Sequence, residues 1–175
     1  GPNSYRCNFK AIPFVAVLAR SGIELDQLAE EEERGGLLIE DRYGDNTLQY
    51  LAIMSDYSDE EELNQRMDNV CLSQFIQLQR MGLFIQEDIS RYFLLHNLCN
   101  RLYFTERRLQ FLVEMDPSSL VHINLYGRLP LHIAAHSTIQ AFRIVLEYVI
   151  RYYPNKKGIT MLFIKNNYGE TPFQM

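Results

Sequence analysis

Two pairs of residues in the chain have the types and the spacing that chemistry requires. His132 and His136 lie four residues apart, which places both rings on one face of a helix and is a spacing that metal sites use. Residues 133–135 between them are Ile-Ala-Ala, so the glutamate of a zinc-protease motif is absent and no third ligand is in view. We therefore predict no metal site and no cofactor.

The second pair is an imidazole and a thiol. Cys99 lies three residues after His96, so the two side chains could be neighbours on a helix, as nucleophilic catalysis requires. The competing interpretation is that Cys99 is a small buried residue, and buried thiols are usually inert. Neither of the glycine-rich phosphate loops, GxxxxGK[ST] and GxGxxG, occurs in the chain. We predict that the chain is not an enzyme.

The composition is that of an ordinary folded domain, because 47% of the 175 residues are hydrophobic and 22% are charged. The longest uncharged apolar run, at 11–19, contains Pro13 and is far shorter than the roughly 20 residues of a membrane helix. We predict no membrane insertion. Residues 1–4, Gly-Pro-Asn-Ser, are typical of what tag cleavage and cloning leave behind, and we exclude them from the fold.

The cysteines indicate a compartment. The chain has three cysteines, Cys7, Cys71 and Cys99. Their odd number and wide separation fit neither a disulfide framework nor the paired spacing of a zinc site. Reduced thiols are typical of the cell interior. We therefore expect an intracellular protein, cytoplasmic or nuclear.

One phrase recurs along the chain. Its clearest copy, Gly127–Ala135, is Gly-Arg-Leu-Pro-Leu-His-Ile-Ala-Ala, and a copy that contains Thr-Pro begins at Gly169. A weaker copy begins at Gly44, and a copy without its glycine spans Phe93–Cys99. A phrase that recurs in this way is the mark of a repeat architecture, in which each copy belongs to one structural unit.

The phrase resembles the signature of the ankyrin-repeat family, G-x-T-P-L-H-x-A-A, which opens the first of two antiparallel helices. The resemblance implies an all-α fold, an ankyrin-like solenoid of stacked antiparallel helix pairs joined by hairpin loops. Successive motif positions are 47, 36 and 42 residues apart, more than the family's period of about 33, so the repeats carry insertions. We predict a single domain over residues 5–175, with approximate repeats at 9–40, 41–84, 85–122 and 123–164 and a partial repeat at 165–175.

The resemblance also gives roles to the motif residues. The motif leucines face the core, namely Leu48, Leu95 and Leu131. The motif histidines, His96 and His132, hydrogen-bond the backbone of the loops. Leu51 and Leu98 replace the first small alanine of the signature, so we expect looser or shifted packing in those two repeats.

Apolar periodicity predicts the second helix of three repeats. The first of these helices spans 70–81. The second follows Thr105, a candidate N-cap, and ends before Pro117. The third follows Thr138 and ends before Pro154, with an apolar stripe made of Ile139, Phe142, Leu146, Val149 and Ile150.

Charged stretches lie between these elements. Asp56–Glu62 is acidic and Asn155–Gly158 is a basic turn, and we predict that both are exposed, mobile insertions. Two runs of consecutive acidic residues stand out. One is Glu30–Glu33, and the other is Asp59–Glu62, the last four residues of Asp56–Glu62. Such runs are usually solvated surface, and the alternative is a docking site for a basic segment.

The two halves of the chain have opposite charge. Residues 1–87 contain 7 Lys or Arg and 16 Asp or Glu, a net −9, whereas residues 88–175 contain 10 and 6, a net +4. Opposite charge would steer a charged partner and would permit head-to-tail self-association. The basic patch of the second half consists of Arg101, Arg107, Arg108, Arg143, Arg151, Lys156 and Lys157. This patch could bind an acidic peptide. Nucleic acid is the weaker option because the net charge of the chain is −5.

Tyrosine precedes the motif glycine three times, at Tyr43, Tyr126 and Tyr168. In an ankyrin-like fold these residues lie at or near the tips of successive hairpins, where tyrosines supply interface anchors. The alternative is that each ring packs on the next hairpin. On the concave face the resemblance points to five residues, namely Tyr50, Asn97, Asn100, Ile133 and His136.

The predicted function is that of a non-catalytic module or scaffold that binds a protein or peptide partner through the hairpin tips and the concave helix face. One alternative is a self-assembling structural element. Another is a regulatory or targeting domain of a longer protein. The fold indicates binding by analogy only, because one fold hosts many functions.

Overall fold

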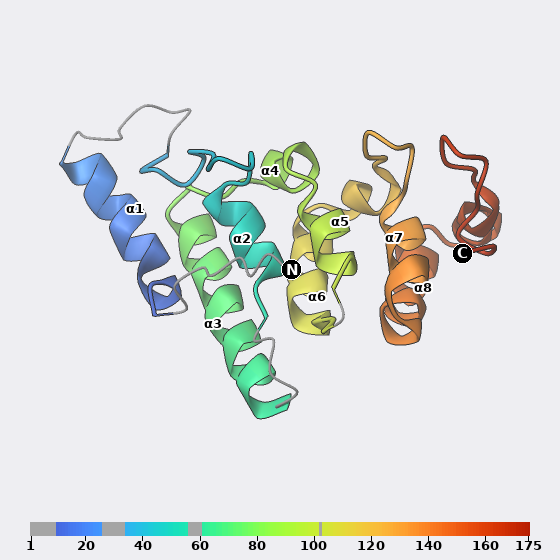
Figure 1. Ribbon diagram of the computed structural model, residues 1–175, viewed down its shortest axis with the longest axis horizontal. Helices are drawn as coiled ribbons and strands as arrows, with labels where there is room; N and C mark the ends of the chain where they lie inside the picture. Colours follow the sequence, from blue (N-terminus) through green and yellow to red (C-terminus); the bar gives the residue numbers. More distant parts are fainter. Residues whose placement is uncertain (1–9, 26–33, 56–60, 102) are drawn as a thin grey trace. The chain divides into compact units, whose positions relative to one another are not determined.

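The computed structural model describes residues 10–25, 34–55, 61–101 and 103–175. These residues form helices, turns and loops, with no strand among them (Figure 1). The predicted all-α fold class is therefore confirmed. None of the helices in these ranges combines the length and the apolar character that crossing a membrane requires.

The first of two compact units, Gly1–Ile85, is built around one long helix. Its elements are the 3-10 helix η1 (Ile12–Phe14) and the helices α1 (Val15–Glu24), α2 (Thr47–Ile53) and α3 (Glu61–Arg80). Because α3 contacts η1, α1 and α2, its buried side chains form the centre of this core. The side chain of Gln74, on α3, accepts a hydrogen bond from the backbone N–H of Ala16 at 3.0 Å and so ties α1 to α3.

The start of α2 is fixed by a reciprocal pair of hydrogen bonds. Asn46 Oδ1 accepts from the backbone N–H of Gln49 at 3.1 Å, and Gln49 Oε1 accepts from the backbone N–H of Asn46 at 2.9 Å. Reciprocal capping satisfies N–H groups that the start of a helix leaves open. The weak copy of the phrase at Gly44 therefore opens a helix.

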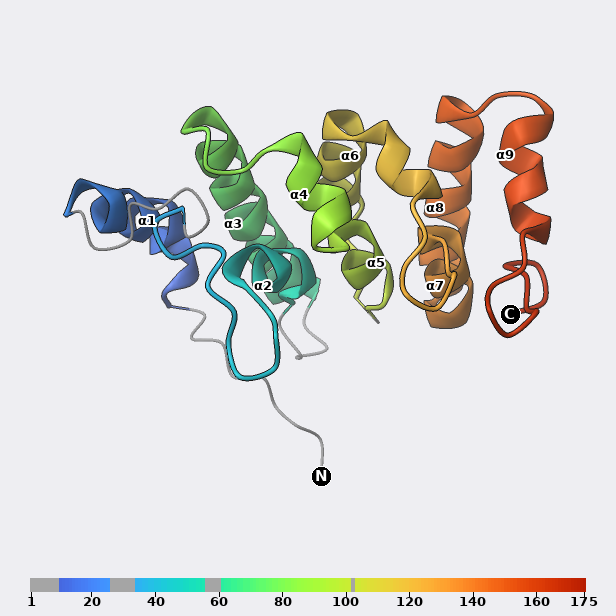
Figure 2. The same cartoon turned by 90° about the horizontal axis from the view of Figure 1, so that it is seen from above.

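The second compact unit, Gln86–Met175, is a series of short helices (Figure 2). They are α4 (Gln86–Arg91), α5 (Leu94–Cys99), α6 (Glu106–Met115), η2 (Pro117–Val121), α7 (Pro130–Ser137), α8 (Ile139–Tyr152), α9 (Lys156–Thr160) and η3 (Met161–Phe163). Helix α5 packs against both α6 and α7, and α7 packs against α8. Each helix of this series is thus covered by its neighbours in the unit.

The motif leucines are buried in the cores of their own units. Leu48 and Leu131 are 0% exposed and Leu95 is 1% exposed. Cys99 and Ala52, at the end of their copies of the phrase, are also fully buried. The phrase therefore directs its leucine inward in each of these helices, whereas Ala135, the last residue of the clearest copy, is half-buried.

All three predicted second helices are present. The helix predicted at 70–81 is the C-terminal part of α3, and Gly82 follows it with a φ of 72°. The helix predicted after Thr105 is α6. Thr105 occupies the N-cap position, but its side chain makes no capping hydrogen bond.

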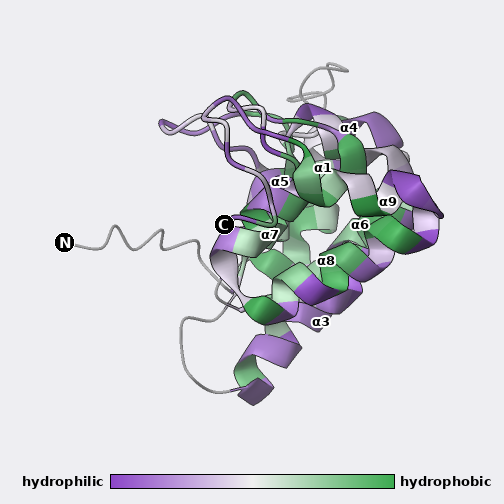
Figure 3. Ribbon diagram, turned by 90° about the vertical axis from the view of Figure 1, so that its right-hand side faces the viewer, coloured by the Kyte–Doolittle hydropathy of each residue, from purple (hydrophilic) through white to green (hydrophobic). Residues whose placement is uncertain are grey.

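The third predicted helix, α8, buries a different face. Thr138 is its N-cap, and Thr138 Oγ1 accepts from the backbone N–H of Ala141 at 3.1 Å, but Ile139 and Ile150 of the predicted stripe are 88% and 44% exposed. Of the predicted stripe only Val149 is buried, and the other buried side chains of α8 are Ala141, Ile144, Val145 and Tyr148. Hydrophobic and hydrophilic ribbon alternate along α8 in Figure 3, and apolar side chains occur on two of its faces. Periodicity alone therefore did not identify the covered face.

The acidic insertion predicted at Asp56–Glu62 is in part helical. Only Glu61 and Glu62 belong to the described residues, and they form the first turn of α3. Carboxylates are favourable there because the N-terminus of a helix carries partial positive charge. Two other features of the sequence, Glu30–Glu33 and Cys7, lie outside the described residues.

The basic turn predicted at Asn155–Gly158 is also in part helical. Lys156 and Lys157 are exposed, as predicted, but they open α9. Gly158 is buried, and a Cβ atom at this position would lie 2.6 Å from the backbone oxygen of Tyr153. Two backbone segments approach closely here, and the stretch predicted as a turn is in part the first turn of a helix.

Candidate interaction surface

Three hairpins are built by the same hydrogen bonds. In the hairpin Asn124–Arg128, Asn124 Oδ1 accepts from the backbone N–H groups of Tyr126 and Arg128, each at 3.0 Å. The backbone N–H of Asn124 donates to the oxygen of Arg128 at 2.9 Å, and the N–H of Gly127 donates to the oxygen of Asn124 at 2.9 Å. A side chain that bonds its own turn in this way sets the direction of the tyrosine that follows.

The other two hairpins repeat this pattern. In Asn166–Glu170 the Asn166 side chain accepts from Tyr168 and from Glu170, at 2.9 and 3.0 Å. In Asp41–Asp45 the Asp41 side chain accepts from Tyr43 and from Asp45, at 2.8 and 3.2 Å. The sequence analysis missed this residue, although an Asp or Asn stands three positions before each motif glycine. That spacing was the signal for the turn.

In the second unit two of these hairpins are joined directly. The backbone N–H of Asn167 donates to the oxygen of Tyr126 at 3.1 Å, and Asn167 Nδ2 donates to the oxygen of Leu125 at 3.3 Å. Arg128 and Glu170 add an ion pair with an N–O distance of 3.6 Å. The two tips are thus held as one surface.

Gly127 and Gly169 occupy equivalent places in these hairpins but differ in their surroundings. Both have positive φ, 69° and 79°, which costs a residue with a Cβ atom about 1–2 kcal/mol. A Cβ at Gly127 would also collide with the side chain of Asn167, whereas a Cβ at Gly169 has no atom within 4 Å.

We therefore expect Gly169→Ala to lower the free energy of unfolding by about 1 kcal/mol, through backbone strain alone. Gly127→Ala should lower it by about 2–3 kcal/mol, because the joined hairpins must also separate. Urea unfolding of both variants measures the difference. Equal losses would mean that the Asn167 contact does not stabilise the pair.

The tips bring two of the predicted site residues together. The rings of Tyr126 and Tyr168 are stacked, with centroids 6.5 Å apart and planes 24° apart, and the side chains remain 55% and 63% exposed. The guanidinium carbon of Arg128 lies 5.6 Å from the centre of the Tyr168 ring. Each ring therefore packs on the next hairpin and yet keeps more than half of its surface open. We call Tyr126 and Tyr168 the tyrosine pair.

The third predicted tip residue, Tyr43, belongs to the first unit. It is 51% exposed, and the guanidinium of Arg42 lies over its ring at 4.6 Å. The hydroxyl of Tyr50, on α2, donates a hydrogen bond to Asp41 Oδ2 at 2.6 Å. This bond lowers the pKa of Asp41. Tyr50 thus supports the hairpin, and its half-buried ring remains partly accessible.

The other predicted residues lie on α5 and α7, two helices in contact. Asn100 and His136 are exposed, and Asn97 and Ile133 are half-buried. Asn97 Nδ2 donates to the backbone oxygen of Tyr92 at 3.4 Å. The structure therefore gathers these four residues on neighbouring helices of the second unit.

The motif histidines connect helices to hairpins, as the resemblance implies. His132 Nδ1 accepts from the backbone N–H of Leu129 at 3.0 Å, and His132 Nε2 donates to the oxygen of Ile164 at 3.0 Å. His96 Nε2 donates to the oxygen of Arg128 at 2.9 Å. We assign the proton to Nε2 in both rings because each carbonyl oxygen needs a donor.

No family model matches the sequence, and neither do any of the curated proteins or the solved structures with which it was compared.

The two residue pairs with possible chemistry are not arranged for it. Both ring nitrogens of His132 bond to the backbone, so this ring is not available as a metal ligand beside His136. The Cys99 thiol is fully buried, and burial raises its pKa well above the usual range. Within the described ranges no three His, Cys, Asp or Glu side chains are grouped so as to hold a metal ion.

Proposed function

We propose that this chain is a non-catalytic interaction module of ankyrin-like helix pairs that binds a protein partner through the tips of hairpins Asn124–Arg128 and Asn166–Glu170. The observation that carries the proposal is the tyrosine pair, which is stacked and more than half exposed. Neither hydroxyl has a hydrogen-bond partner among the described residues. Tyrosine is one of the side chains that are enriched at protein interfaces, where its ring packs and its hydroxyl finds a hydrogen-bond partner.

The rigidity of the tips supports the same proposal. The side-chain bonds of Asn124 and Asn166 fix each turn, and Asn167 joins the two turns. A partner that docks there orders few side chains that were free before. Preorganisation of this kind improves affinity because binding then costs less conformational entropy.

Two observations support the ankyrin-like part of the proposal. Three of the predicted repeats, 41–84, 85–122 and 123–164, each contain two contacting helices, α2 with α3, α5 with α6, and α7 with α8. In the second unit His96 and His132 each reach a backbone oxygen 32 residues further along the chain. Equal reach at two successive copies of the phrase is what a repeated unit predicts.

The double variant Tyr126→Ala/Tyr168→Ala tests the function. We expect it to lose the partner that the unaltered chain captures from its source cells, with affinity for the purified partner reduced about 30-fold or more. Its melting temperature should change by less than about 3 °C, because both side chains are largely exposed. Phe163→Ala is the matched control, since Phe163 is an aromatic residue with 59% exposure that belongs to neither hairpin. A double variant that binds as well as the control contradicts the proposal.

A further inference from the structure

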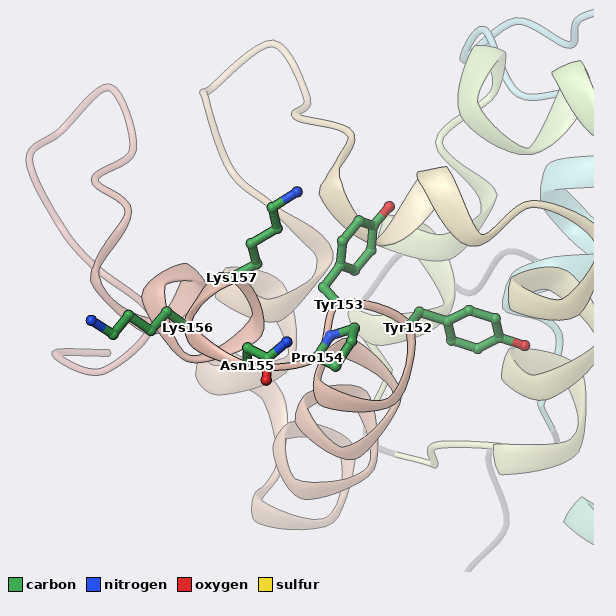
Figure 4. A pocket seen from close by; sticks show the side chains of 6 residues that line it. All are labelled: Tyr152, Tyr153, Pro154, Asn155, Lys156 and Lys157. Carbon is green, nitrogen blue, oxygen red and sulfur yellow. The ribbon is translucent and has the colours of Figure 1, made fainter.

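A second candidate site lies at the turn between α8 and α9. The turn lines a hollow with a volume of about 730 Å³ (Figure 4), formed by Tyr152, Tyr153, Pro154, Asn155, Lys156 and Lys157. We call it the α8–α9 hollow. Its volume lies in the range of sites that hold small ligands or a few residues of a peptide. It includes no residue of the tyrosine pair.

The walls of the hollow have two kinds of chemistry. In Figure 4 the side chains of Lys157 and Tyr153 rise on the same side of the turn, whereas Lys156 points away from them. The Tyr153 hydroxyl donates to the backbone oxygen of Pro117 at 3.3 Å, which fixes the ring. The hollow therefore has the ammonium group of Lys157 on the same side of the turn as a fixed aromatic ring, and the ammonium group of Lys156 lies on the other side of the turn.

The backbone of the turn is held in an uncommon conformation. Asn155 has φ 67° and ψ −144°, a region that residues with a Cβ atom rarely occupy. The packing of Gly158 against the oxygen of Tyr153 fixes the other end of the turn. Lys156 and Lys157 are therefore presented from a backbone that the surrounding structure determines.

The positive charge of this region is not neutralised locally. Between residues 148 and 169 the chain has four basic residues and no acidic residue, the four being Arg151, Lys156, Lys157 and Lys165. The acidic residues that bound this segment each pair with an arginine, Glu147 with Arg143 at 3.9 Å and Glu170 with Arg128 at 3.6 Å. Lys156 and Lys157 form no ion pair with any residue that the structure describes.

We propose that the α8–α9 hollow binds an acidic peptide segment. A glutamate or aspartate carboxylate of the segment meets the ammonium group of Lys157, the chain beside it packs on the Tyr153 ring, and a second carboxylate further along the segment meets Lys156 on the other side of the turn. This site goes beyond the proposed function, because it predicts a second and chemically different contact away from the hairpin tips.

Charge also decides between an acidic peptide and a nucleic acid. The affinity of nucleic acid rises with the number of phosphates that a protein neutralises, and a long polyanion responds to the charge of a whole surface. Here the chain has a net charge of −5, with −9 in residues 1–87, which repels a long polyanion. A short acidic segment interacts with the local positive charge alone.

Fluorescence anisotropy with fluorescein-labelled hexaglutamate tests the proposal. We expect the double variant Lys156→Glu/Lys157→Glu to weaken binding at least tenfold. The matched control is Arg151→Glu/Lys165→Glu, which changes the net charge by the same amount within the same segment but outside the hollow, and it should weaken binding less than threefold. Because all four side chains are exposed, circular dichroism should show both variants folded. If the first variant does not fold, Lys157→Gln replaces it, with an expected loss of about threefold.

Each other outcome overturns the proposal. If hexaglutamate does not bind to the unaltered chain, the hollow is not a site for acidic peptides. Equal losses in the two double variants show unspecific attraction, and tighter binding of labelled hexathymidylate shows a nucleic-acid site. Tyr126→Ala/Tyr168→Ala should leave hexaglutamate binding unchanged, so a failure at the hairpin tips and a failure at the hollow are distinguishable.

Discussion

Replacement of His132 by alanine is expected to lower the free energy of unfolding by about 3–4 kcal/mol. The side chain is 0% exposed and bonds to two backbone groups, the N–H of Leu129 and the oxygen of Ile164. Alanine leaves both groups without these partners, which costs about 1–3 kcal/mol for each buried group, and it opens a cavity beside α7. Urea unfolding followed by circular dichroism measures the loss.

His136→Ala is the control for this variant. His136 lies on the same helix, four residues later, and is exposed. We expect a change within about 0.5 kcal/mol, as for most exposed positions that make no special contact. If the two alanine variants lose equal stability, the bonds of His132 do not hold the hairpin to the helix.

The sequence predicted the structure well where the determining interactions join residues that are close together in the chain. The recurring phrase predicted the start of α7, because a proline in the first turn and an inward leucine act over a few neighbouring residues. Helix α5 also begins within its copy of the phrase, although Phe93 at its N-cap makes no capping hydrogen bond. Pro130 stands at the first position of α7, where its missing N–H costs nothing. Leu131 follows it into the core.

The sequence was less informative where an element has two apolar faces or where a contact joins distant residues. The face of α8 that is covered depends on α7 and α9, so the predicted stripe was wrong at Ile139 and Ile150, which are exposed, although Val149 is buried. Gln74 meets Ala16 across 58 residues, and no local pattern indicates that hydrogen bond. The helix α3 also begins at Glu61, earlier than the predicted start at residue 70, and its first turn contains Glu61 and Glu62.

In the candidate site, too, the sequence indicated local features but not contacts between distant residues. The Tyr-Gly pairs identified the tips, because the glycine of such a turn must adopt positive φ. The stacking of Tyr126 on Tyr168 depends on Asn167, which joins two hairpins that are about 40 residues apart in the chain. The sequence therefore indicated the residues of the tyrosine pair but not their contact.

The largest effect of pH on stability is expected from His96. The ring is 5% exposed, and burial lowers its pKa from the ordinary value of 6.5 to about 4, although the hydrogen bond to Arg128 opposes this shift. Between these two values the unfolded chain binds a proton at His96 and the folded chain does not, so stability falls as the pH falls. Between pH 7 and pH 5 the loss from His96 is about 2 kcal/mol. Burial also lowers the pKa of His132, which adds a loss in the same direction.

His96→Gln isolates the share of His96, because the glutamine amide keeps an N–H donor for the oxygen of Arg128 but does not titrate. Urea unfolding at pH 7, 6 and 5 gives the free energy of unfolding of both proteins. We expect the unaltered chain to lose about 2 kcal/mol more than the variant over this range. Parallel losses would mean that His96 is protonated in the folded state, and a protonated ring could not remain buried against the hairpin backbone without a carboxylate beside it.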